Sequence, residues 1–235
     1  MHRHLESVMG TVVGITSPAP LPDDGLAAAV DALHDADRVF STWVDDSPVQ
    51  RLRRGEAVTD AVDAALIDEV LERCKVARVL TGGAFDPWAM PGGVDPTGLV
   101  KGWAAGRALH ALTAAGAGHA LVHAGGGGWR VGIRHPARPD AVVAVVEVTA
   151  AIATSGDYER PGQLIDPATG RAARVAASAT VTGPDLDLAD ALATGLAVGG
   201  RPVLARIDAL DDYEAHLISD DGHHFATPGM AFVDP

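Results

Sequence analysis

Cysteine and positive charge are scarce in this sequence, and each shortage excludes a class of protein. Cys74 is the only cysteine among 235 residues, which excludes an intramolecular disulfide and a cysteine-rich zinc site. The 18 lysine and arginine residues stand against 31 aspartate and glutamate residues, giving a net charge of −13. Such a charge repels nucleic acid and anionic membranes, so we expect neither as a partner.

Long apolar runs are also lacking. No segment reaches the roughly 18 apolar residues of a transmembrane helix, so we expect no membrane span. The first residues, MHRHLESVMGTVVG, contain neither the apolar core nor the cleavage site of a signal peptide. We therefore expect a cytoplasmic protein.

Hydrophobic residues make up 47% of the chain, which is enough for a substantial core. The sequence shows no repeat of fixed period and no linker long or polar enough to mark a boundary, so we expect one domain over residues 1–235. Helical and strand patterns follow one another without strict alternation. This order predicts the α+β class, with mixed antiparallel sheets flanked by helices.

Apolar periodicity and turn signals predict the individual elements. Helices are expected at residues 26–40, 59–81, 99–115, 187–198 and 201–210. Strands are expected at residues 7–16, 119–124, 129–133, 141–148, 150–154 and 178–182, with a final hairpin formed by 214–219 and 224–227. Gly10 after Met9 predicts either a bulge in the first strand or a close approach of another group. Asp23 or Asp24 is expected to cap the first helix, and Gly82 and Gly83 are expected to end the second.

Residues 82–106, GGAFDPWAMPGGVDPTGLVKGWAAG, combine glycines and prolines with Asp86, Asp95 and Lys101 before a helical pattern begins. Glycines let the backbone approach a ligand closely, and a helix N-terminus with a lysine in its first turn attracts anions. When this stretch is taken alone, a long surface turn with solvated charges is the favoured explanation.

Asp190 and Thr194 lie four residues apart in a predicted helix, so their side chains share one face. A carboxylate and a hydroxyl on one face can bind a hard cation such as Mg²⁺. The alternative is an exposed helix face. The neighbouring residues are apolar, and a buried carboxylate without a partner is costly, so we expect Asp190 to have one.

Other polar segments leave two interpretations open. The four glycines at 125–128 could hold a ligand or form a flexible hairpin, and Thr154 and Ser155 could face a phosphate or lie in a plain turn. His123 in a predicted strand is more often a satisfied core histidine, and His223 and His224 in a turn are more often surface residues.

Taken together, the motifs resemble the ApbE family of FAD:protein FMN transferases over nearly the whole chain. In order they are MGT (9–11), STWVDDS (41–47), GAFDP (83–87), VDPTGLVKGWA (94–104), AGGGGWRVGIRHP (124–136), AIATSGDYER (151–160), LIDPATG (164–170) and ADALATGLAVGG (189–200). The resemblance implies a single α+β unit that binds FAD in a cleft. It also implies Mg²⁺-dependent cleavage of the FAD pyrophosphate and transfer of FMN onto a threonine of an acceptor protein, with release of AMP. Some members of the family hydrolyse FAD to FMN and AMP instead, and members are often exported.

The resemblance also assigns residues. Asp190, Thr194 and the backbone carbonyl of Gly98 are implied as metal ligands. The residues implied at the FAD site are Met9, Trp43, Ala84, Phe85, Asp86, Asp95, Lys101, Thr154, Ser155 and Leu164. The candidates for a catalytic role are Lys101, Asp157 and Gln163.

Three positions depart from the family pattern. Gln163 stands where the family usually has a histidine before the I-D-P motif, and a glutamine cannot accept a proton near neutral pH. His119, His123 or Asp157 could act as the base in its place. Gly127 replaces a usual Asn or Asp, and Arg53 replaces a usual asparagine. The alternatives to transfer are therefore FAD pyrophosphatase activity and FAD binding without catalysis.

Overall fold

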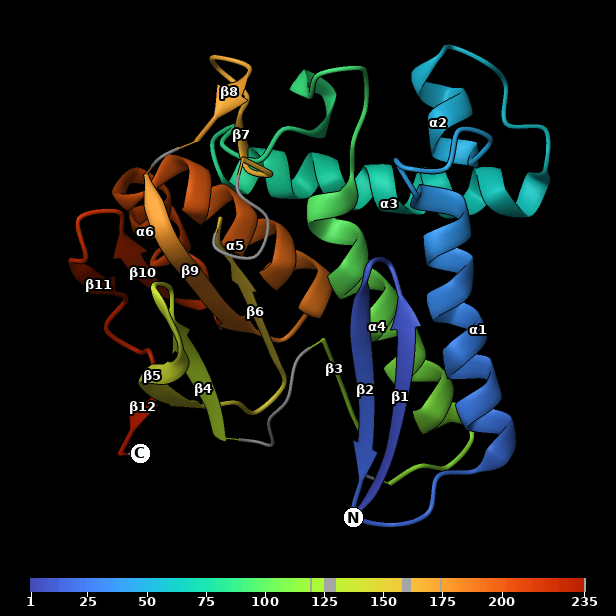
Figure 1. Cartoon of the computed structure of the whole chain (residues 1–235), viewed down its shortest axis with the longest axis horizontal. Coiled ribbons are helices and arrows are strands. Elements are labelled where there is room, and N and C mark those ends of the chain that lie inside the picture. The colour runs from blue at the N-terminus through green and yellow to red at the C-terminus, as the bar shows by residue number, and fades with distance from the viewer. Residues whose placement is uncertain (119, 125–129, 158–161, 174, 235) are drawn as a thin grey trace.

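Two helices, α4 (Thr97–Ala114) and α5 (Leu186–Gly199), pack against each other at the centre of the molecule, and a separate sheet accompanies each of them (Figure 1). This arrangement comes from a computed structural model that describes residues 1–118, 120–124, 130–157, 162–173 and 175–234. Both helices carry many small residues, which lets their backbones approach closely.

The first half of the fold surrounds α4. Its sheet has the order β1-β2-β3 and is antiparallel throughout. Its elements are β1 (His2–Val8), β2 (Thr11–Ser17), β3 (Leu121–Ala124), α1 (Asp23–Phe40), α2 (Pro48–Arg53), α3 (Ala61–Leu80) and the 3₁₀ turn η1 (Pro87–Ala89). Ile15 of the sheet, Leu33 of α1 and Leu112 of α4 are fully buried in one shared core, so the sheet and the helices form a single layered unit.

The second half is built around α5. The elements of its main sheet, in the order β11-β10-β9-β6, are β6 (Ala151–Ser155), β9 (Ala176–Gly183), β10 (Glu214–Ser219) and β11 (His224–Ala226). Helices α5 and α6 (Arg201–Ile207) pack on this sheet through a second core that contains Leu192, Leu196 and Leu217.

Two small sheets complete the second half. The first has the order β12-β5-β4 and consists of β4 (Arg130–His135), β5 (Arg138–Glu147) and β12 (Phe232–Val233). Ile133 and Val146 of this sheet pack with Met230 and Ile152 in a third cluster, which joins it to the main sheet. The second is the pair β7 (Ile165–Asp166) and β8 (Arg171–Ala172).

Glycine at position 102 sets how closely the two central helices pack. A Cβ atom at Gly102 would lie 2.5 Å from the carbonyl oxygen of Leu186 and 2.9 Å from the Cα atom of Asp187. Any larger residue would therefore push α4 and α5 apart. The close approach brings the start of α4 beside the middle of α5, where Asp190 and Thr194 lie.

The α+β class with antiparallel sheets is confirmed, and each predicted helix is present within a few residues of its expected bounds. Gly82 and Gly83 follow the end of α3 as predicted, with φ angles of 64° and 87°. The final hairpin, β10–β11, also forms where its turn signal predicted it.

The prediction for residues 7–16 was wrong. This segment is the tight hairpin β1–β2, with Met9 and Gly10 as its two turn residues instead of a bulge inside one strand. Their φ angles are 53° and 68°, and two-residue hairpin turns of type I′ require positive φ at both positions. Methionine is an unusual residue there, so the sequence signal for the turn was weak.

The predicted cap of the first helix was also wrong. Pro22 is the N-cap of α1, and no side chain caps it, because Asp23 and Asp24 already lie in the first turn. The short elements α2, β7, β8 and β12 were missed. In the described part of the chain, no helix has the length and apolar character needed to cross a membrane.

Candidate functional site

The start of α4, the middle of α5 and the end of β6 meet at a group of oxygen atoms. The hydroxyl of Thr194 donates a hydrogen bond to the carbonyl oxygen of Gly98 at 3.3 Å. The hydroxyl of Ser155 lies 3.0 Å from the Thr194 hydroxyl on its other side. Three elements that are distant in sequence therefore place two hydroxyls and one carbonyl together.

Asp190 lies one helical turn before Thr194 and is only 6% exposed. Its Oδ2 atom accepts a hydrogen bond of 3.0 Å from the backbone N–H of Gly102, while Oδ1 makes no hydrogen bond to any described residue. Burial raises the pKa of the Asp190 carboxyl, whereas the charge of Lys101 and the Gly102 N–H act in the opposite direction. The partners that we expected for Asp190 are thus the backbone amide of Gly102 and the nearby ammonium group of Lys101.

The oxygen atoms of Asp190, Thr194, Ser155 and Gly98 suit a hard divalent cation. They come from a carboxylate, two hydroxyls and a carbonyl, all of which provide oxygen ligands of the kind that Mg²⁺ prefers. Among residues with a described position, no three His, Cys, Asp or Glu side chains cluster as metal ligands. A site here would rest on Asp190 as its charged ligand, with Thr194, Ser155 and Gly98 completing the set.

The glycine at 98 allows close packing at this point. A Cβ atom there would lie 3.2 Å from the Thr194 hydroxyl and 3.1 Å from the ring of Phe85. Phe85 itself is 5% exposed and packs in the first core beside the start of α4. Ala84 is half-buried next to it, and Leu164 is buried in the neighbouring core of α5.

Both predicted FAD-binding carboxylates are held by arginines. Asp86 accepts a hydrogen bond of 2.6 Å from Arg78 and a second from the backbone of Trp88 at 3.1 Å. Asp95 accepts from the backbone N–H of Thr97 at 3.1 Å and from its hydroxyl at 2.6 Å. The remaining oxygen of Asp95 lies 3.4 Å from the guanidinium of Arg53.

The other predicted FAD residues lie at varied depths. Lys101 is exposed on α4, next to Gly102, so its ammonium group faces solvent. Trp43 lies between α1 and α2 with 84% of its surface exposed. Met9 lies at the β1–β2 turn and is partly buried against the first core. The hydroxyl of Thr154 pairs with that of Thr180 at 2.9 Å across the sheet, so Thr154 does not join Ser155 beside Thr194.

Gln163 and Asp157 lie on the two sides of the segment 158–161. The amide of Gln163 donates to the carbonyl oxygen of Gly156 at 2.7 Å, and Asp157 accepts from the backbone N–H of Gly162 at 2.7 Å. The sequence had named two further bases. His119 lies outside the described residues. His123 lies in β3, where its backbone pairs with Gly14, and its side chain is not among the described ones.

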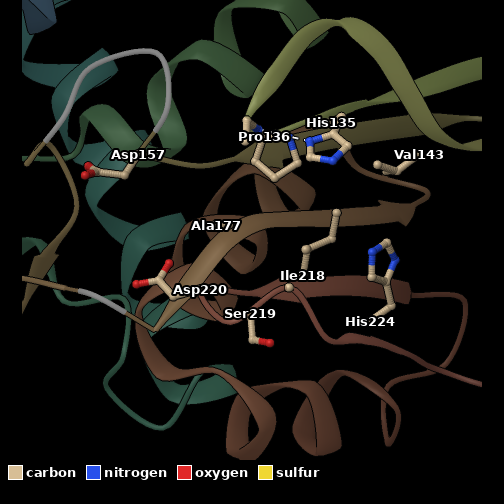
Figure 2. Close-up of a pocket in the computed structure, with 11 residues that line it drawn as sticks. His135, Pro136, Val143, Asp157, Ala177, Ile218, Ser219, Asp220 and His224 are labelled. Atoms are coloured by element: carbon tan, nitrogen blue, oxygen red, sulfur yellow. Dashed lines mark hydrogen bonds between the residues drawn. The ribbon is translucent and has the colours of Figure 1, made fainter.

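Asp157 also lines a cavity of about 420 Å³ that is separate from the Asp190 and Thr194 group. The cavity lies between the β4–β5 turn and the β10–β11 hairpin. Figure 2 shows Asp157 at one end, with His135 and His224 toward the other. The predicted catalytic role of Asp157 is thus not supported by contact with the oxygen cluster.

Sequence reasoning missed the partners that hold the predicted residues in place. The N–H of Gly102, the guanidinium of Arg53 and that of Arg78 each contact a carboxylate that the motifs had named. A bare glycine inside an otherwise helical pattern was the available signal for Gly102. The two arginines had no comparable signal, because their partners lie 42 and 8 residues away in the sequence.

Comparison with known proteins agrees with the resemblance seen in the motifs. A curated relative, the FAD:protein FMN transferase of Rhodobacter capsulatus, is 39% identical over 157 residues, which cover 58% of this chain and 30% of the relative. The matched part of this chain therefore spans about 30% of the length of that relative.

Solved structures share the fold at low identity. The ApbE protein of Thermotoga maritima matches with a TM-score of 0.80 and 21% identity, covering 97% of each chain. The flavin transferase ApbE of Vibrio cholerae matches with a TM-score of 0.74 and 22% identity, again over 97% of each chain. The flavinyl transferase ApbE of Pseudomonas stutzeri gives 0.76 and 19%, covering 97% of this chain and 94% of the other.

The family model decides the classification. The model of the ApbE family matches residues 9–92 and 89–217, which is most of the chain and includes every element around the oxygen cluster. Because this match covers most of the chain, the chain belongs to the ApbE family.

Proposed function

We propose that residues 1–235 form one FAD-binding unit that, with Mg²⁺, transfers FMN from FAD onto a threonine of an acceptor protein and releases AMP. The observation that carries the proposal is the meeting of Thr194, Ser155 and the Gly98 carbonyl from three separate elements, with Asp190 one turn before Thr194 and in contact with the same helix α4 through the Gly102 N–H. Family membership and the name of the Rhodobacter capsulatus relative support the same reaction.

In this proposal Asp190 supplies the charged ligand of the cation. Thr194, Ser155 and the Gly98 carbonyl supply neutral oxygen ligands, and the hydroxyls of Ser155 and Thr194 are also hydrogen-bonded to each other. When bound, Mg²⁺ supplies Lewis-acid polarisation of phosphoryl oxygens. The ammonium of Lys101, exposed on the same helix as Gly98, adds positive charge toward the anionic pyrophosphate.

The reaction replaces a phosphoanhydride bond of FAD with a phosphoester bond to threonine. The hydroxyl oxygen of the acceptor threonine forms a bond to the phosphorus of the FMN moiety, and the P–O bond to the AMP phosphate breaks. AMP leaves with the bonding electron pair, and the threonine proton must pass to a base. Charge neutralisation at the pyrophosphate is the part that this chain's residues serve most directly.

The choice of the base that accepts the threonine proton leads to a second candidate function. Gln163 stands at the expected histidine position, and its amide already donates to the carbonyl of Gly156. An amide cannot accept a proton, so activation of threonine at this position is absent. The second candidate is hydrolysis of FAD to FMN and AMP, in which water replaces threonine as the nucleophile and its proton must likewise pass to another acceptor.

One assay separates these functions. The protein is incubated with FAD and Mg²⁺, with and without a threonine-containing acceptor peptide, and AMP and peptide-bound flavin are quantified. Transfer predicts AMP together with covalently labelled peptide, whereas hydrolysis predicts equal AMP with or without peptide. FAD that stays intact in every reaction would contradict both and leave FAD binding alone.

Asp190→Asn tests the cation ligand because it keeps the size of the side chain. We expect AMP release to fall about 100-fold or more, while FAD binding measured by flavin fluorescence changes far less. Asp68→Asn on the exposed face of α3 is the matched control and should behave as the wild type. An equal loss of activity and FAD binding in Asp190→Asn would show that Asp190 has a structural role instead.

A further inference from the structure

We propose that Arg53 is a positioning residue for the start of α4, acting through Asp95 and the loop 91–95. The inference rests on the proposed function, because the start of α4 carries Gly98, which we assign to the cation. Arg53 lies at the end of α2 and is distant from α4 in sequence, yet its side chain is only 12% exposed.

The guanidinium of Arg53 uses three nitrogens on three acceptors of one loop. Nη2 donates to the carbonyl oxygen of Pro91 at 2.8 Å, and Nε donates to that of Gly92 at 3.1 Å. Nη1 lies 3.4 Å from the Asp95 carboxylate. A lysine has one nitrogen and cannot reach three acceptors in this fixed fork, so the arrangement requires arginine.

The loop is shaped to receive Arg53. A Cβ atom at Gly92 would lie 2.8 Å from the Arg53 Nη2 atom, and one at Gly93 would lie 3.3 Å from the Arg53 backbone. Both glycines have positive φ angles, 81° and 110°, which other residues rarely adopt. The loop is anchored at its far end by the N–H of Asp95, which donates to the carbonyl of Pro87 at 2.9 Å.

Asp95 carries the effect to α4. Its Oδ1 atom accepts hydrogen bonds from both the N–H and the hydroxyl of Thr97, the first residue of the helix. Gly98 follows directly. No side chain caps α4 at its N-cap residue, Pro96, and the Asp95 carboxylate instead holds the first residue of the helix, Thr97, by two hydrogen bonds. Arg53 thereby sets the position of the Gly98 carbonyl.

Arg53 also balances charge at the site. An unpaired carboxylate at Asp95 would repel an anionic pyrophosphate approaching the start of α4. The paired guanidinium offsets that charge while leaving Asp95 able to hold Thr97. Arg78 pairs with Asp86 in the same way, though its own side chain is 53% exposed.

Three variants test the inference. Arg53→Met removes all three hydrogen bonds, Arg53→Lys keeps the charge, and Arg51→Met alters an exposed arginine of the same helix as the matched control. Amide hydrogen exchange is measured over residues 92–100, and Mn²⁺ affinity is measured from the electron paramagnetic resonance signal of the free ion. AMP release is followed against Mg²⁺ concentration.

We expect Arg53→Met to speed amide exchange in residues 92–100 about tenfold, and to raise both the Mn²⁺ dissociation constant and the half-saturating Mg²⁺ concentration about tenfold. The kcat at saturating Mg²⁺ should stay close to that of the wild type, because no reacting group is removed. Arg53→Lys should recover part of the loss, and Arg51→Met should match the wild type. Adding Asp95→Asn to Arg53→Met should cause little further loss, since both act through one contact.

Wild-type exchange rates in Arg53→Met would overturn the proposal. Faster exchange with unchanged Mn²⁺ affinity would overturn it too, because Arg53 would then stabilise the loop without positioning the site. If the wild type releases no AMP, the proposed function fails, and the Mn²⁺ affinities still decide the role of Arg53. A wild type that binds no Mn²⁺ also overturns it, since there would be no site to position.

Discussion

Replacing Gly102 by alanine tests the packing that creates the candidate site. The new Cβ atom would lie 2.5 Å from the Leu186 carbonyl oxygen, 2.8 Å from the Asp190 Cβ atom and 2.9 Å from the Asp187 Cα atom. Two of these neighbours are backbone atoms of α5, so a change of side-chain rotamer cannot relieve the contact. Helices α4 and α5 must move apart, and the Gly102 N–H must move away from the Asp190 carboxylate.

The expected magnitude follows from three contributions. Overpacking of a tight core costs about 1–3 kcal/mol. Weakening the hydrogen bond to a buried carboxylate costs about 1.5–3 kcal/mol. Alanine in place of glycine inside a helix returns about 1 kcal/mol. The free energy of unfolding should therefore fall by about 1.5–5 kcal/mol, which lowers Tm by roughly 3–20 °C for a domain of this size.

Urea and thermal unfolding followed by circular dichroism measure this loss. Gly106→Ala is the control, because it lies one turn further along α4 and a Cβ atom there meets nothing within 4 Å. It should raise the free energy of unfolding by about 0.5–1 kcal/mol through helix propensity alone. If Gly102→Ala stabilised the protein to the same extent, the close approach of α4 and α5 and the argument for the site would both be refuted.

Two further predictions concern buried titratable groups. Burial and the neighbouring His224 lower the pKa of His216 from 6.5 to about 4. Between these two pH values, His216 therefore binds a proton in the unfolded chain and stays neutral in the folded chain. His216 should leave the free energy of unfolding unchanged above pH 6.5 and should lower it by up to about 3 kcal/mol as the pH drops to 4. In urea titrations, His216→Phe should reduce this dependence of the unfolding free energy on pH. An unchanged pH dependence would contradict the assignment. Cys74 is fully buried, and its pKa is raised to about 12. A disulfide reagent should therefore label Cys74 in urea but not in the native protein. Rapid labelling of the native protein would contradict this and would show that helix α3 opens readily.

The sequence by itself determined the elements whose signals are local. Apolar residues at helical spacing predicted α1, α3, α4 and α5, because each buries a continuous stripe against a core. The paired glycines after α3 and the turn around Gly222 were predicted for the same reason, since positive φ angles are demanded within a few residues. The motifs likewise named Asp190 and Thr194, which helical spacing alone brings to one face.

Other features were decided only by the tertiary structure. Nothing near Met9 in the sequence showed that residues 7–16 fold back as a hairpin, because the pairing of β1 with β2 relies on the core beneath them. Whether Ser155 or Thr154 faces Thr194 depended on the register of β6 against β9. A shift of one residue would have exchanged the two side chains.

The partners of the site's carboxylates were the least predictable part. Arg53 reaches Asp95 from 42 positions away, and the Gly102 amide reaches Asp190 from 88 positions away. Such contacts exist only once α2, α4 and α5 have packed, since hydrogen bonds depend on distance in space and not on separation along the chain. The sequence thus determined which residues we propose for the chemistry, and the packing of α4 on α5 decided how they are held.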